Sequence, residues 1–119
     1  MSTIKTPKRE EVDARSQIVF DTLKKNIGMV PNIYATIGYS SNVLESFLAF
    51  SGNAGNGVFT GKEIEAIKLA VSEANGCEYC QAAHSVLGKM SGFSEEETIQ
   101  IRRGEFTDTR LNALITLSQ

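Results

Sequence analysis

The two cysteines and the single histidine of this chain all lie in one short segment, Asn75 to His84. Cys77, Cys80 and His84 are spaced i, i+3 and i+7, so on a helix they share one narrow stripe. A cysteine in the first turn of a helix is favoured as a thiolate, because unpaired N–H groups and the positive end of the helix dipole lie there. The segment therefore offers an attacking thiol, a resolving thiol and an imidazole that can move protons.

The preceding helical pattern holds two carboxylates that could orient His84, those of Glu65 and Glu73. If the chain folds back at Gly76, Glu65 lies roughly 15 Å from the bend and His84 roughly 10 Å, at 1.5 Å per residue, so their side chains can meet. Glu73 lies too near the bend to reach His84 easily. Spacing alone nevertheless favours a simpler pairing, in which Glu65 contacts Lys68 on an exposed helix face.

The elements that must position these residues all read as helices, because no run of strict alternation bounded by turns is present. Asn75-Gly76 is a strong helix stop, and two capping boxes begin at Thr60 and Ser94. We therefore predict an all-α fold, a compact bundle of six to seven helices. The expected helices are Arg9–Ile27, Asn32–Ile37, Asn42–Phe50, Thr60–Asn75, Cys77–Lys89, Ser94–Arg103 and a last one that starts near Thr107 or Asp108.

We expect one domain over residues 1–119, with residues 1–8 as a loose N-terminal lead-in. The glycine-rich stretch Ser51–Gly57 predicts a mobile connector, since the lysine that a phosphate-binding loop needs does not follow it. The last helical pattern ends at Gln119 without a stop signal. Either the chain is a fragment, or this helix docks on a partner.

Composition limits the classes of function. The chain has 119 residues, 41% of them apolar and 22% charged, which suits one small hydrophobic core. A net charge of −2 argues against a surface dedicated to nucleic acid or to an anionic membrane. No secretory signal or membrane span is evident, so we expect a cytoplasmic protein. A C-x-x-C pair in that compartment indicates redox chemistry or metal binding.

The spacing of Glu65, eleven residues, Cys77-x-x-Cys80 and then x-x-x-His84 forms a fairly specific pattern. Over about Phe59–Gly92 it resembles the alkylhydroperoxidase D-like branch of the carboxymuconolactone decarboxylase family. The resemblance implies an all-α fold that assembles into trimers or hexamers. It also implies a thiol-dependent peroxidase, an oxidoreductase that is regenerated through a disulfide.

The roles that the resemblance implies fall on four residues. Cys80 would be the peroxidatic thiol and Cys77 the resolving one, with Glu65 and His84 as the proton relay. The expected partners are a hydroperoxide substrate, an external dithiol reductant and further copies of the chain, and no cofactor or metal ion is called for. Tyr79 departs from the pattern, because the best-known branch has a second histidine there. A packing or hydrogen-bonding role fits Tyr79 better than proton transfer.

Three alternatives stay open at this point. Cys77, Cys80, His84 and Glu65 could together bind zinc, although a structural zinc site usually has two separated ligand pairs. The chain could also be a non-catalytic helical assembly module, with small buried cysteines and a core histidine. Decarboxylation is less favoured than peroxide reduction, because the decarboxylase branch typically lacks the cysteine pair.

Overall fold

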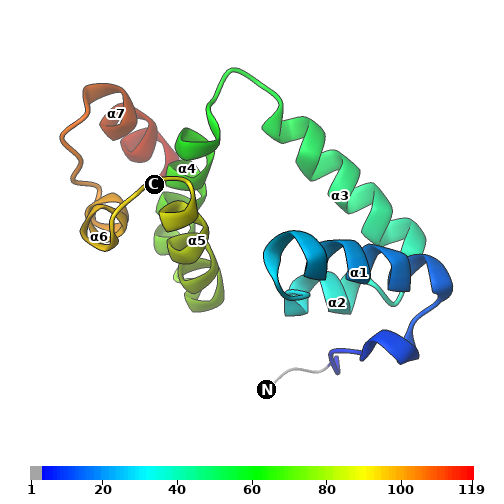
Figure 1. Cartoon of the computed structure of the whole chain (residues 1–119). Coiled ribbons are helices and arrows are strands. Elements are labelled where there is room, and N and C mark those ends of the chain that lie inside the picture. Colours follow the sequence, from blue (N-terminus) through cyan, green and yellow to red (C-terminus); the bar gives the residue numbers. More distant parts are fainter. Residues whose placement is uncertain (1–3) are drawn as a thin grey trace. The chain divides into compact units, whose positions relative to one another are not determined.

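The structure is a computed structural model that describes residues 4–119 (Figure 1). It contains a short 3-10 helix and seven α-helices in this part of the chain, and no strand there, so the all-α prediction is confirmed. No helix in residues 4–119 is long and apolar enough to cross a membrane. The elements are the 3-10 helix Arg9–Glu11, α1 Ala14–Ile27, α2 Asn32–Ile37, α3 Ser41–Gly55, α4 Gly61–Ala74, α5 Glu78–Met90, α6 Glu95–Arg103 and α7 Thr109–Ser118.

The chain divides into two compact units, with the boundary between Ala54 and Gly55. The expectation of a single domain over residues 1–119 stays a prediction. In the first unit the core side chains come from the segment before α1 and from α1, α2 and α3. They are Val12, Phe20, Ala35 and Leu44.

Two predicted helix limits in the first unit were wrong. The helix expected from Arg9 begins only at Ala14, because the Asp13 side chain accepts the Ser16 N–H at 2.8 Å and caps the helix there. The third helix continues past Phe50 to Gly55, so most of the expected connector is helical. A helix gains one hydrogen bond per added residue, which offsets the cost of about 1 kcal/mol for each glycine inside it.

The second unit is built around α4, which packs against α5, α6 and α7. Its buried apolar core side chains are Ala66, Leu69, Ala70, Phe93, Ile101 and Ile115. The capping boxes at Thr60 and Ser94 are both present, so these predicted helix starts are confirmed. Asp108 caps α7 through the Leu111 N–H at 2.8 Å, which also agrees with the predicted start of the last helix.

The bend between α4 and α5 lies at Gly76, as the helix-stop signal predicted. Gly76 has φ +61°, a left-handed conformation that glycine adopts at little steric cost. The N–H of Cys77 then donates to the Ser72 carbonyl at 3.0 Å, which fixes the first residue after the bend against the end of α4. The bend lets α5 run back along α4, so side chains on the two helices can meet.

Candidate thiol and histidine site

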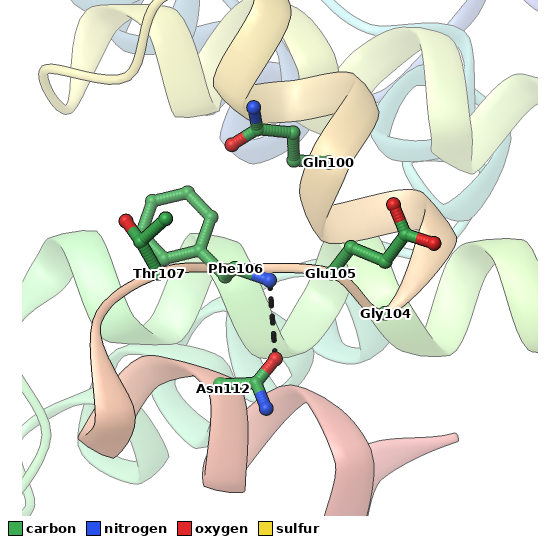
Figure 2. Close-up of a pocket in the computed structure, with 6 residues that line it drawn as sticks. All are labelled: Gln100, Gly104, Glu105, Phe106, Thr107 and Asn112. Carbon is green, nitrogen blue, oxygen red and sulfur yellow. Dashed lines mark hydrogen bonds between the residues drawn. The ribbon is translucent and has the colours of Figure 1, made fainter.

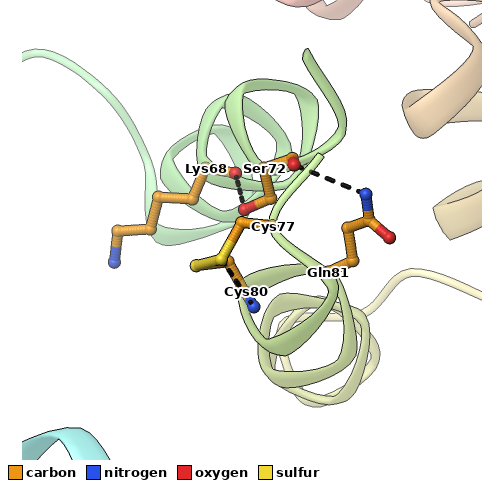
Figure 3. The surroundings of a disulfide bond; sticks show 5 residues. All are labelled: Lys68, Ser72, Cys77, Cys80 and Gln81. Carbon is orange, nitrogen blue, oxygen red and sulfur yellow. Dashed lines mark hydrogen bonds between the residues drawn. A yellow bond between two sulfur atoms is a disulfide. The ribbon is translucent and has the colours of Figure 1, made fainter. Parts of the chain in front are cut away.

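The two cysteines lie at the N-terminus of α5 and are joined by a disulfide, with their Cα atoms 5.3 Å apart (Figure 3). Cys77 is the N-cap residue, and its Sγ accepts the backbone N–H of Cys80 at 3.3 Å. A sulfur in this place faces the unpaired N–H groups and the positive end of the helix dipole. The same position in the reduced protein favours a thiolate at Cys77.

Glu65 and His84 meet across the two helices, a contact that their distances from the bend allowed although spacing alone favoured the Glu65–Lys68 pairing. The Glu65 Oε2 and His84 Nδ1 atoms are 2.8 Å apart. Lys68 Nζ donates to the other carboxylate oxygen, Oε1, at 3.0 Å. The two pairings that the sequence set against each other therefore both exist, one on each oxygen of Glu65.

The surroundings of Glu65 keep it ionised. Burial raises the pKa of Glu65, but the hydrogen bonds from His84 and Lys68 outweigh burial, and the net pKa lies below the usual value. An ionised carboxylate can only accept hydrogen bonds, so Nδ1 of His84 carries the hydrogen that lies between them. In a neutral imidazole of this tautomer, Nε2 has the lone pair and can take a proton.

His84 lies one turn after Cys80 on the same helix. Residues at i and i+4 are neighbours on a helix surface, roughly 5–6 Å apart between Cβ atoms. The His84 side chain is 22% exposed and that of Glu65 is 12% exposed, so the pair is mostly withdrawn from water but still open to it. The arrangement resembles a triad, in which a carboxylate orients a histidine that handles a thiol proton.

Sequence reasoning missed a second set of contacts, which holds the bend. Gln81 Nε2 donates to the Ser72 carbonyl at 3.4 Å, the same carbonyl that accepts the Cys77 N–H (Figure 3). On α6, Arg102 donates to Gln81 Oε1 at 3.2 Å and to Glu73 Oε2 at 2.6 Å. Glu73 thus pairs away from His84, as its place near the bend predicted. No spacing rule signals a partner 21 residues away on another helix.

The second unit also has a surface hollow, which lies apart from these residues. The hollow in Figure 2 has a volume of about 510 Å³ and is lined by residues of α6, the following loop and α7. None of the four predicted site residues lines it.

Within residues 4–119, no three His, Cys, Asp or Glu side chains gather in a way that could hold a metal ion. Tyr79, between the cysteines, is 49% exposed.

The fold and site together define an all-α protein with a disulfide-forming pair at a helix N-terminus beside a carboxylate–histidine pair. Residues 42–115 match the sequence model of the carboxymuconolactone decarboxylase family, and the chain belongs to that family. The match is consistent with the alkylhydroperoxidase D-like branch that the cysteine motif predicted. It includes Glu65, Cys77, Cys80 and His84. None of the curated proteins compared with the chain matches it.

Proposed function

We propose that this protein is a thiol peroxidase that reduces hydroperoxides through Cys77 and Cys80. The observation that carries the proposal is the contact between Glu65 and His84 at 2.8 Å, since His84 lies on the same stripe of α5 as two cysteines close enough to form a disulfide. Both parts are needed, since a peroxidatic thiol has to lose a proton and its oxidised form has to be resolved. The family to which the chain belongs includes both decarboxylases and peroxidases.

In the proposed first half-reaction, the Cys80 thiol gives its proton to Nε2 of His84. The resulting thiolate attacks the terminal, hydrogen-bearing oxygen of the hydroperoxide, an S–O bond forms and the O–O bond breaks. The leaving alkoxide takes the proton from the imidazolium and departs as an alcohol. Cys80 is then a sulfenic acid, oxidised by two electrons. We assign this role to Cys80 because it lies one turn from His84, and because the family resemblance gives it the same role.

In the second half-reaction, the Cys77 thiolate attacks the sulfenic sulfur of Cys80. Its N-cap position, where the backbone N–H of Cys80 points at Sγ, favours the thiolate that this step needs. The disulfide forms and hydroxide leaves, which becomes water with the proton released from Cys77. An external dithiol then restores both thiols by two exchange steps and is itself oxidised to a disulfide.

We further propose that the chain works as a homo-oligomer, a trimer or a hexamer. Three apolar side chains on one stripe of α5, Tyr79, Val86 and Met90, are 49%, 54% and 68% exposed. An exposed apolar stripe of this kind supports a contact with another chain. Light scattering at several protein concentrations tests this, and a monomer at all of them would refute it.

Thiol titration tests the peroxidase proposal. The fully reduced protein is treated with one equivalent of cumene hydroperoxide, and free thiols are counted over time, with Cys77→Ser and Cys80→Ser alongside. We expect the wild type to lose both thiols and to regain them with a dithiol. Cys77→Ser should consume one equivalent and form no intramolecular disulfide, and Cys80→Ser should not react. Persistence of both wild-type thiols would refute peroxidase activity toward this class of peroxide.

A further inference from the structure

Glu65 has a cation on one oxygen and a histidine on the other. Lys68 Nζ lies 3.0 Å from Oε1, and His84 Nδ1 lies 2.8 Å from Oε2. Lys68 lies one turn further along α4, so its side chain reaches the carboxylate without any contribution from another element. The Lys68 side chain is 48% exposed, whereas that of Glu65 is 12% exposed, so the carboxylate is the buried partner of the pair.

Few charged groups act on this carboxylate. Of the residues that the structure describes, Lys68 on α4 and His84 on α5 are the charged or titratable groups that influence Glu65. Other basic side chains nearby pair with other glutamates: those of α6 and α7 pair with glutamates of α4, and the single lysine of α5 pairs with a glutamate of α6. These other ion pairs are Arg102–Glu73, Arg110–Glu63 and Lys89–Glu95.

We infer that Lys68 is a positioning residue that keeps Glu65 a carboxylate throughout the reaction, so that the proton taken from the thiol stays on His84 until the leaving alkoxide takes it. The inference rests on the proposed function. If the proton moved on from His84 Nδ1 to Glu65, the Lys68 ammonium would lose its anionic partner. That lost interaction disfavours a neutral Glu65 and favours the imidazolium–carboxylate pair.

The inference fixes the direction of proton movement. Glu65 orients the ring and stabilises the imidazolium, and it takes up no proton itself. The aspartate of a serine–histidine–aspartate triad acts in the same way and also stays unprotonated. The proton enters at Nε2 and has to leave from Nε2, to the alkoxide released from the peroxide. A glutamate without a lysine neighbour could instead accept the proton and pass it on.

The test measures the protonation of Glu65 directly, in the oxidised protein and without turnover. The protein carries glutamate labelled with ¹³C at the side-chain carboxyl, and the Glu65 resonance is identified by its loss in Glu65→Gln. Its pH titration is compared in wild type, Lys68→Met, Lys68→Arg and Lys89→Met. Lys89 is a matched control, because it is an exposed lysine that pairs with a glutamate outside the site.

We expect Lys68→Met to strengthen proton binding at Glu65 by about two- to five-fold, the range for a partly exposed ion pair. Lys68→Arg and Lys89→Met should titrate as the wild type does. An unchanged titration in Lys68→Met would overturn the inference, and so would an equal shift in Lys89→Met. Since this measurement needs no peroxide, it stands or fails independently of the peroxidase activity.

A second measurement tests the claim about the proton. The rate of thiol loss with cumene hydroperoxide is followed against pH in the same variants. The rate declines at acid pH, and in Lys68→Met this decline should begin at a proton concentration about two- to five-fold lower than in the wild type, which is a higher pH. Lys68→Arg should have the wild-type profile. A Glu65 titration that shifts while this profile stays fixed would overturn the claim that the proton remains on His84.

Discussion

The two compact units use their polar side chains differently. In the first unit the ion pairs Arg9–Asp21 and Arg15–Glu45 are exposed, and the buried Ser16 hydroxyl donates to the Gly38 carbonyl at 2.7 Å. That buried contact satisfies the hydrogen-bonding capacity of the Gly38 carbonyl. In the second unit the mostly buried Glu65 carboxylate contacts His84, which lies on the same helix as two cysteines. The difference points to α4 and α5 as the helices that carry the candidate chemistry.

The largest expected effect separates two glutamates of α4. Glu65→Gln should slow peroxide-driven thiol loss by about 10²-fold or more, because the histidine loses the carboxylate that fixes its tautomer and stabilises its charge. Glu73→Gln is the matched control, since Glu73 also pairs with a basic group of a neighbouring helix, Arg102. Its rate should stay within a few-fold of wild type. Stopped-flow measurement of thiol loss gives both values, and equal slowing would contradict the assignment.

The next effect tests the contrast between the units through stability. Leu44 is fully buried in the first unit, and Leu44→Ala should lower the free energy of unfolding by about 2–5 kcal/mol. The folded fraction should nevertheless lose its thiols to peroxide at the wild-type rate. Urea unfolding and thiol titration check the two statements. A large rate loss in fully folded Leu44→Ala would show that the first unit takes part in the chemistry.

A smaller effect is expected where Arg102 joins the bend to α6. Arg102→Met leaves Glu73 and Gln81 without their shared partner and should cost about 1 kcal/mol of stability, because the site is about one-third exposed. Urea unfolding of the oxidised protein measures it. Arg103→Met, the adjacent arginine, is the control and should change stability less. An equal loss of unfolding free energy in Arg103→Met would contradict the role that we assign to Arg102.

The smallest effect concerns pH. The pKa of Glu65 in the folded protein is lowered, so its ionised form contributes stability that is fully present above the usual glutamate pKa. This contribution is lost as pH falls through the lowered folded pKa. The difference in unfolding free energy between wild type and Glu65→Gln should therefore shrink from about pH 5 downward. A difference that grows toward acid pH would reverse the sign that we derive.

Local signals predicted much of the fold and of the site. Caps and glycine stops placed α4 to α7. The distances of Glu65 and His84 from Gly76 allowed their contact, because two helices joined by a tight bend have little freedom in register, but spacing alone favoured the Glu65–Lys68 pairing. The start of α1 and the end of α3 were missed, because a nearer cap and helix propagation outweighed the apolar pattern. The Gln81–Arg102 contact could not be predicted, since it depends on how α6 packs against α4 and α5.

The central claim is that peroxide oxidises Cys80 first. The most direct test treats reduced Cys77→Ser with cumene hydroperoxide and dimedone, which traps sulfenic acid, and locates the adduct by peptide mass spectrometry. We expect the adduct on Cys80, and no adduct on Cys77 when Cys80→Ser is treated in the same way. An adduct on Cys77 in Cys80→Ser, with none on Cys80 in Cys77→Ser, would reverse the roles of the two thiols. The absence of any adduct would contradict the account.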